Sequence, residues 1–326
     1  MKNTFIIMLI LIMFSPAICF SKEKTFSYEL EFGNPAAKRI LQVGGNGNLN
    51  ITGYSGDKIL VSANENVFEE DAEVNEKAKG LKRLGGGGFN IINNKKENLI
   101  IISRSITGMD TDLTIKAPNN ITLRLGSGGN INRQHLKRQA RELRRDIEKY
   151  NSSGNGPANN FIPPDFPFPV TYVPAAANGI IQGNILIKDL TGTIEANTIN
   201  GNVSVENIDG EVTASSVEGN INIIFNKLNK DNALYFSTVN GEIDITLPKK
   251  TAADIMAKTL NGNVYSGFGG ESTTENVMKE NTGTSGPQDS VSNIIHANYI
   301  TSRINGGGQE IYLSTINGNI YIRKGE

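Results

Sequence analysis

Residues that could carry out chemistry are few in this sequence and widely spaced. The 326 residues include two histidines, His135 and His296, and one cysteine, Cys19. Structural zinc sites combine several Cys and His residues at short spacings, and these three residues do not form such a cluster. The glycine runs at 85–88 and 126–129 lack the Lys-Ser/Thr pair of a phosphate-binding loop. We therefore expect no bound metal and no cofactor, and we identify no catalytic residues.

One set of polar and aromatic residues is a candidate for ligand binding. Asn222, Asp244, Tyr265 and Tyr321 each lie three positions after a glycine of a repeated motif. Tyrosine offers a flat apolar ring and a polar tip, so these residues could bind a glycan or a peptide. Asp244 is the one acid among them and has no obvious partner, whereas glycan-cleaving enzymes use paired carboxylates. The simplest interpretation is a solvated sheet face.

The motif belongs to a repeat that predicts stacked strands. Glycines recur every nine residues from Gly183 to Gly219, and apolar residues follow each of them at the second and fourth positions. Large and small residues alternate at the fourth position, which makes the true period eighteen. Residues eighteen apart then stack in a parallel coil, and glycine marks its corners. The glycines assigned to turns are Gly183, Gly192, Gly201, Gly210, Gly219, Gly241, Gly262 and Gly318.

The corners towards the C-terminus follow the same motif at slightly wider spacing. The steps from Gly219 to Gly241 and from Gly241 to Gly262 span 22 and 21 residues, and we interpret each as one coil. Asparagine precedes the corner glycine at four places, where it can adopt left-handed backbone angles and form a ladder of amides: Asn200, Asn240, Asn261 and Asn317. Asn-Gly is also a strong hairpin signal, so an antiparallel β-meander stays open as the alternative fold.

The N-terminus predicts export. Lys2 precedes an apolar run at 5–14, and small residues follow it, as in a secretory signal peptide spanning 1–22. No later segment has the ~20 apolar residues of a membrane span, so the mature chain should not cross a membrane. We expect it in the periplasm, on the outer-membrane surface or outside the cell. Lipidation at Cys19 is the less favoured alternative, because Ile18 stands where lipoprotein signals have a small residue.

Interruptions of the repeat define the domain organisation. Residues 23–130 are expected to form N-terminal strands and a capping helix of the solenoid. Residues 131–178 should form an insertion, in which a helix rich in basic residues precedes a Pro-rich loop. Residues 179–326 should form the repeat solenoid, with a disordered loop near 267–294. The basic helix either lies on the solenoid or docks on acidic lipid or a partner.

Composition supports an all-β chain and excludes one class of partner. The 32 basic and 33 acidic residues leave a formal net charge of −1, so we expect no nucleic-acid partner. The 35 glycines, together with short runs of Val, Ile, Thr and Asn, suit many short strands and tight turns.

Three segments resemble the bacterial putative adhesin family, a β-strand-repeat domain of unknown function in exported proteins. They are TDLTIKAPNNITLRLGSGG, LTGTIEANTINGNVSVENIDGEVTASSVEGNINI and INGGGQEIYLSTINGNIYIRK. The resemblance extends from about Tyr28 to Lys324 but omits the 131–178 insertion and the loop after Phe268. It implies a right-handed parallel β-solenoid (β-helix) at the cell envelope or surface, and it supplies no catalytic residues.

The leading hypothesis is therefore a noncatalytic exported solenoid that presents a rigid surface for cell-envelope interaction or adhesion. Its partner would be a glycan or an envelope protein, and the sequence does not indicate the oligomeric state. Two alternatives stay open. One is a polysaccharide-active β-helix enzyme, and the other is a periplasmic scaffold or sensor for a membrane partner.

Overall fold

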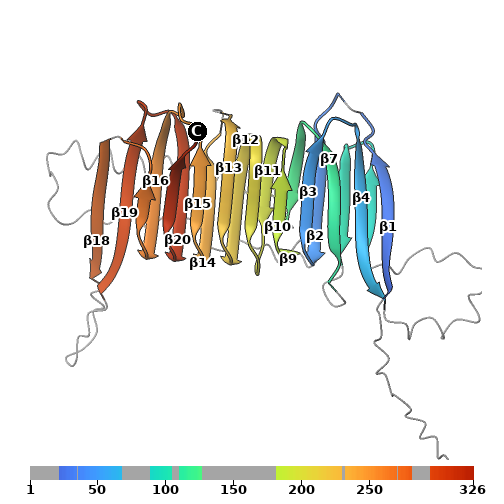
Figure 1. The fold of residues 1–326 in the computed structure, drawn as a ribbon, viewed down its shortest axis with the longest axis horizontal. Helices are drawn as coiled ribbons and strands as arrows, with labels where there is room; N and C mark the ends of the chain where they lie inside the picture. Colours follow the sequence, from blue (N-terminus) through green and yellow to red (C-terminus); the bar gives the residue numbers. More distant parts are fainter. Residues whose placement is uncertain are drawn as a thin grey trace, which may run out of the picture.

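The computed structural model describes residues 22–34, 36–67, 89–104, 110–126, 181–229, 232–269, 271–280 and 294–326. Within these ranges the chain forms strands and no helix, and Figure 1 shows the strands side by side in one long stack. No helix long and apolar enough to cross a membrane is present in this part of the chain. The predicted capping helix and the 131–178 insertion lie outside the described residues, as do residues 1–21 of the predicted signal peptide.

The strands form two facing layers. The first layer contains, in spatial order, β1 (Lys22–Glu31), β4 (Lys58–Val67), β7 (Asp112–Pro118), β3 (Leu49–Tyr54), β10 (Ile185–Lys188), the first half of β12 (Val203–Glu218), β13 (Ile221–Leu228), β15 (Ile243–Leu247), β21 (Ile320–Lys324) and β17 (Val264–Ser266).

The second layer contains β5 (Phe89–Asn94), β6 (Leu99–Arg104), β2 (Arg39–Asn46), β8 (Ile121–Leu125), β11 (Thr191–Asn197), the second half of β12, β14 (Leu234–Asn240), β20 (Gln309–Asn317), β16 (Ala253–Asn261), β19 (Ile294–Ile304) and β18 (Glu271–Glu280). The short strand β9 (Ile181–Gln182) pairs with the end of β2. Strand β12 passes from one layer to the other and joins them into a single sheet.

Neighbouring strands of the repeat run parallel with the predicted register. Ile185 lies opposite Val203, and Val203 lies opposite Ile221, each pair eighteen residues apart. The parallel coil is thereby confirmed, and the antiparallel meander is excluded for the repeat. Within the described ranges, antiparallel pairs occur only near the two ends of the stack. The right-handed winding implied by the family resemblance stays a prediction.

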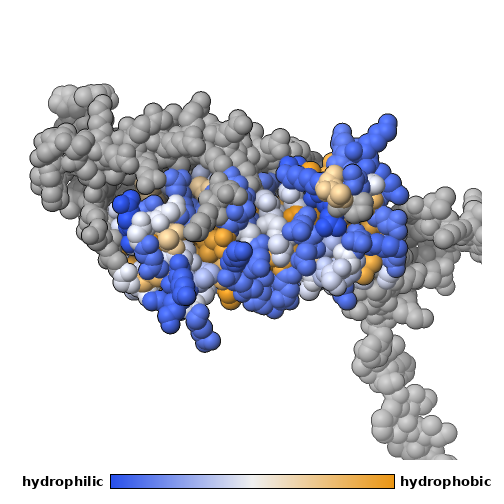
Figure 2. Space-filling model, turned by 90° about the horizontal axis from the view of Figure 1, so that it is seen from above, coloured by the Kyte–Doolittle hydropathy of each residue, from blue (hydrophilic) through white to orange (hydrophobic). Residues whose placement is uncertain are grey.

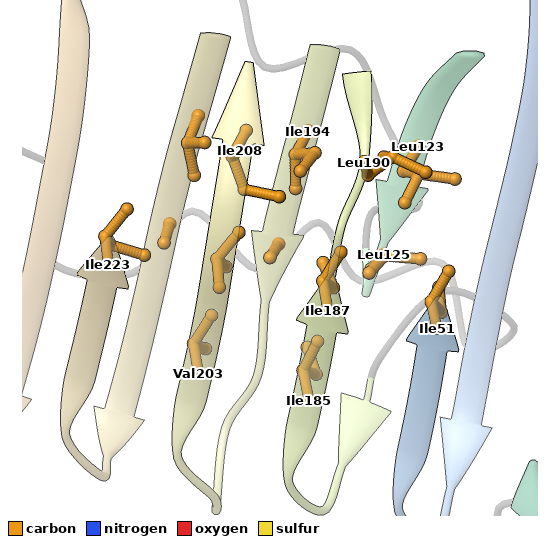
Figure 3. Close-up of a cluster of buried hydrophobic side chains, with 14 of the residues drawn as sticks. Ile51, Leu123, Leu125, Ile185, Ile187, Leu190, Ile194, Val203, Ile208 and Ile223 are labelled. Carbon is orange, nitrogen blue, oxygen red and sulfur yellow. The ribbon is translucent and has the colours of Figure 1, made fainter. Parts of the chain in front are cut away.

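Aliphatic side chains fill the space between the layers. Figure 3 shows Ile187 of the first layer and Ile194 of the second among these buried side chains. Large Ile187 and Val205 are buried in the first layer, and small Ala196 and Ala214 are buried in the second. All four are at most 1% exposed. Each large aliphatic residue buried in this way stabilises the fold by about 1.5–3 kcal/mol. The core therefore runs the length of the stack.

Glycine is required at the corners because successive turns of the backbone touch there. A Cβ atom on Gly201 would lie 2.2 Å from the carbonyl oxygen of Gly183, and its φ of +151° also disfavours a side chain. Gly219 and Gly318 show the same contact with the glycine of the neighbouring coil. Asparagine before a corner glycine can adopt left-handed angles, but this capacity is not used at Asn200, Asn240, Asn261 or Asn317. At two of these corners the positive φ falls on the glycine itself, at Gly201 and Gly318.

Two sets of polar side chains tie the corners of neighbouring coils together. At five of the described corners, a buried hydroxyl three residues before the glycine donates to a glycine carbonyl of the neighbouring coil, as Thr238 does to Gly219 at 2.9 Å. The residues in this position are Thr198, Ser216, Thr238, Thr259 and Thr315. On the solvent side the predicted amide ladder forms from Asn240 through Asn317 to Asn261. The hydroxyls give the glycine carbonyls of the corner a hydrogen-bond donor, and the ladder pairs the amide side chains with one another.

The C-terminal coil occupies an interior position that the sequence spacing did not predict. Gly262 was expected to stack on Gly241, one coil away, but it stacks on Gly318, and Gly318 stacks on Gly241. Strands β20 and β21 therefore lie between β14–β15 and β16–β17, and the red β20 is enclosed by earlier strands in Figure 1. At the opposite end, β2–β3 lies between β6–β7 and β8–β10 in the same manner.

Both ends of the stack carry antiparallel strands. β18 and β19 extend the second layer at one end, so residues 271–280, part of the expected loop near 267–294, form a strand. At the other end the buried guanidinium of Arg104 donates to the carbonyls of Gly47, Asn48 and Thr111 at 2.6–3.1 Å. Burial lowers the pKa of Arg104 to about 10, so it stays charged at neutral pH.

Candidate ligand-binding surface

The four predicted ligand-binding residues form one row on the outer face of the first layer. Asn222 lies opposite Asp244, Asp244 opposite Tyr321, and Tyr321 opposite Tyr265. They come from β13, β15, β21 and β17, and they alternate with inward aliphatic residues such as Ile243 and Ile320. Parallel pairing without a register shift brings residues from 222 to 321 into one line, which we call the tyrosine row.

The two tyrosines of this row stack on each other. The ring centroids of Tyr265 and Tyr321 are 5.2 Å apart, with an angle of 10° between the ring planes. Tyr265 is 50% exposed, and it belongs to β17, which ends the first layer. Because Tyr321 covers one face of the Tyr265 ring, the opposite face is directed beyond the last strand of this layer.

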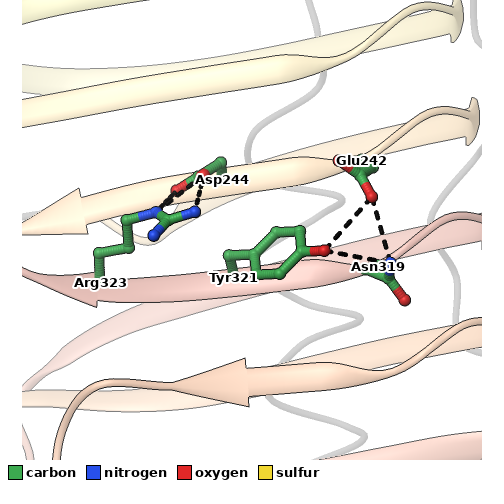
Figure 4. Close-up of polar contacts among 5 residues, drawn as sticks. All are labelled: Glu242, Asp244, Asn319, Tyr321 and Arg323. Carbon is green, nitrogen blue, oxygen red and sulfur yellow. Dashed lines mark hydrogen bonds and ion pairs between the residues drawn. The ribbon is translucent and has the colours of Figure 1, made fainter.

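Asp244 has a partner that sequence reasoning missed. The guanidinium of Arg323 contacts both carboxylate oxygens, with Nε 2.8 Å from Oδ1 and 2.9 Å from Oδ2, and with Nη2 2.7 Å from Oδ2 (Figure 4). The same guanidinium lies 5.4 Å from the centroid of the Tyr321 ring. Hydrogen bonding to Asp244 raises the pKa of Arg323 above its usual value. Arg323 is the next outward position after Tyr321 on β21, which was the signal available in the sequence.

Glu242 and Asn319 form the polar rim beside Tyr321. The Asn319 amide donates to Glu242 Oε1 at 3.1 Å and to the Tyr321 hydroxyl at 3.1 Å (Figure 4). The Tyr321 hydroxyl in turn lies 3.4 Å from Glu242 Oε1. These contacts fix the orientation of the Tyr321 ring, and they place a carboxylate, an amide and a hydroxyl together at the corner of the coil.

The acidic side chain of the row, Asp244, is already paired. Within the described residues no group of three or more His, Cys, Asp and Glu side chains could hold a metal ion. Asp244 is engaged by Arg323 on both oxygens, which disfavours a role as a proton acceptor. His135 and Cys19 lie outside the described residues, and only the backbone of His296 is described, within β19.

The described surface is mainly hydrophilic when the stack is viewed along its strands. Figure 2 shows hydrophobic residues there as small separate patches among polar ones. Tyr28, Ile92 and Tyr265 are the large hydrophobic residues that stand out as exposed within the described part. Of these, Tyr265 stacks on Tyr321, and the Tyr321 ring lies beside the guanidinium of Arg323.

Comparison with known proteins finds a family model that matches part of the chain. Residues 181–298 match the family model described as Toastrack DUF4097. No curated protein matches the chain. A crystal structure of a putative cell adhesion protein from Clostridium sporogenes is 14% identical, covering 93% of this chain and 100% of its own, at a TM-score of 0.38. A putative adhesin from Bacteroides fragilis is 13% identical, with 94% and 98% covered, at a TM-score of 0.35. These TM-scores are too low for either likeness to bear on function.

Proposed function

We propose, from the premise that residues 181–298 carry a Toastrack DUF4097 domain of unknown function, that this protein is a noncatalytic binding protein of the cell envelope. In this proposal the chain is exported through its N-terminal signal, and the tyrosine row binds a glycan of the envelope. The observation that carries the proposal is the half-exposed ring of Tyr265, stacked on Tyr321 and bordered by charged groups.

The chemistry of the row fits a sugar. The exposed face of an aromatic ring packs against the C–H groups of a sugar, and nearby polar groups form hydrogen bonds with its hydroxyls. Arg323 and Asp244 offer a donor and an acceptor on one side of the rings, and Glu242 and Asn319 offer both kinds on the other. The row spans four neighbouring strands, so an extended chain of sugars would meet several of these groups in turn.

Rigidity of the surface supports binding. Each residue of the row sits on a strand paired with its neighbours, and the corners next to it are held by side-chain ladders. Side chains that are already ordered lose less entropy on binding, which improves affinity without additional contacts.

Binding of purified envelope polysaccharide, measured by isothermal titration calorimetry, tests the proposal. The double variant Tyr265→Ala/Tyr321→Ala should bind at least about tenfold more weakly, because it removes the aromatic platform. Tyr28→Ala is the matched control, since Tyr28 is also exposed but lies on β1 at the opposite end of the stack. Equal affinities of the wild type and the double variant would refute a role of the tyrosine row.

The same preparation separates the proposal from its alternatives. If the polysaccharide is shortened on incubation, and if Asp244→Asn abolishes the shortening, the protein is an enzyme. If the protein binds an envelope protein but does not bind the polysaccharide, its ligand is a protein and not a glycan. Under the proposal the polysaccharide is recovered at its original length.

A further inference from the structure

We propose that the C-terminal coil, formed by β20 and β21 (309–324), exchanges between two copies of this chain and so forms a reciprocally swapped dimer. Exchange rebuilds the same neighbours around the coil, including Tyr265 beside Tyr321. The tyrosine row is therefore present in both forms, and the dimer does not depend on the glycan proposal.

The first argument is the interior position of the coil. β20 pairs along its length with β14 on one side and with β16 on the other, and β21 pairs in the same way with β15 and β17. Its inward residues, such as Ile311, Leu313 and Ile320, are completely buried. Without this coil, two strands on each side have unpaired edges and exposed apolar side chains, a combination that readily pairs with another strand.

The second argument is chain order. The C-terminal coil fills a slot whose two walls are β14–β15 and β16–β17. These walls end at Leu247 and Ser266, whereas the coil that fills the slot begins at Gln309. During synthesis and export from the N-terminus, both walls exist before their own coil is available. A slot that is open at this stage can receive the coil of a second copy, which makes identical contacts.

The third argument is that the slot binds the C-terminal coil in preference to the similar coil of β16–β17. Both coils carry the corner motif, as TLNGNVYS at 259–266 and TINGNIYI at 315–322. Only the C-terminal coil supplies Arg323 to Asp244; the position after Ser266, which is opposite Ile322, is Gly267. The ion pair therefore favours residues 309–324, from either copy, over the adjacent segment of the same chain.

The fourth argument is the connection between β19 and β20. These strands lie on opposite sides of β16, so residues 305–308 carry the chain across the end of β16. All of them have positive φ: Asn305 47°, Gly306 86°, Gly307 81° and Gly308 149°. An extended hinge would release Asn305 from its strained conformation, and short strained hinges promote exchange of the segment that follows them.

A disulfide placed across the slot reports which copy supplies the coil. Ser237 on β14 and Ser314 on β20 are opposite each other, so Ser237→Cys/Ser314→Cys in a Cys19→Ser background can close within one chain or between two. After refolding from urea and oxidation, we expect the fraction of linked dimer to be at least about tenfold higher at about 1 mM protein than at about 10 µM. Linked monomer alone at every concentration would overturn the proposal.

Two controls keep the result specific. Ser204→Cys/Asn222→Cys joins consecutive coils and should give linked monomer only; dimer from this pair would show nonspecific association. Insertion of Gly-Ser-Gly-Ser after Gly307 relaxes the hinge and should lower the dimer fraction about fivefold. The unsubstituted chain, refolded at high concentration, should show dimer in native mass spectrometry, and its absence would refute exchange independently of the cysteines.

Discussion

At the corners of the coil, glycine, threonine or serine, and asparagine each meet a different need of the backbone. Glycine allows close approach, since a Cβ on Gly241 would lie 2.1 Å from the Gly219 carbonyl oxygen. The hydroxyl of Thr238 gives that same carbonyl a buried donor. Asn220 accepts from the backbone N–H of Glu242 in the next coil at 2.8 Å. The hydroxyl and the glycine of the motif Thr/Ser-x-Asn/Glu-Gly, together with the asparagine that follows Gly219, thus describe one stacked corner.

Replacement of a corner glycine should therefore be costly. Gly201→Ala places a methyl group against the Gly183 carbonyl and keeps a φ of +151°, so we expect a loss of about 2–4 kcal/mol in the free energy of unfolding, measured by urea denaturation. Gly269→Ala is the control, because no atom of the described residues lies within 4 Å of its added Cβ. Equal stability of the two variants would mean that the corner can open without cost.

At the scale of elements, the Asp244–Arg323 ion pair joins β15 to β21 and favours β21 over other strands as the neighbour of β15. Asp244→Arg and Arg323→Asp should each lower the urea midpoint through like-charge repulsion, and the reversed pair in the double variant should recover most of that loss. Urea denaturation of the four proteins gives the coupling energy. Additive effects of the two single changes would show that the pair contributes no selectivity. High salt should reduce the coupling, because both side chains are partly exposed.

The sequence predicted those elements whose neighbours are close in the chain. The eighteen-residue period fixed the parallel register of β10, β12 and β13, because each coil directly follows the one on which it stacks. It also placed four outward residues in one row, because each of them lies three positions after a corner glycine. It could not predict that β21 separates β15 from β17, since a step of 21 residues from Gly241 to Gly262 is compatible with either order. Arg323 was missed with it, because its contact with Asp244 exists only in that order.

At the scale of the whole molecule, the protein is a one-dimensional stack in which each coil contacts only its neighbours. Stability in such an array is approximately the sum of the coils and of the interfaces between them. In the middle of the stack, neighbouring coils are also consecutive in the sequence. The nested coils at both ends differ, because their neighbours in space are far away in the sequence: β2–β3 contacts β6–β8, and β20–β21 contacts β14–β17. The ends therefore depend on distant residues, whereas the middle depends on local ones.

This difference predicts how the chain responds to loss of its last coil. A chain that ends at Ile304 leaves β14–β15 and β16–β17 without a shared neighbour, while β10 to β13 keep every pairing that they have in the full chain. Hydrogen–deuterium exchange should then show amide protection lost by at least about tenfold in β16 and β17 and retained in β11 and β12. The protected amides of β11 and β12 serve as the internal control. Uniform loss of protection would show that the stack folds as one cooperative unit. Unchanged protection of β16 would show that β16–β17 can dock directly on β14–β15, without the coil that normally separates them.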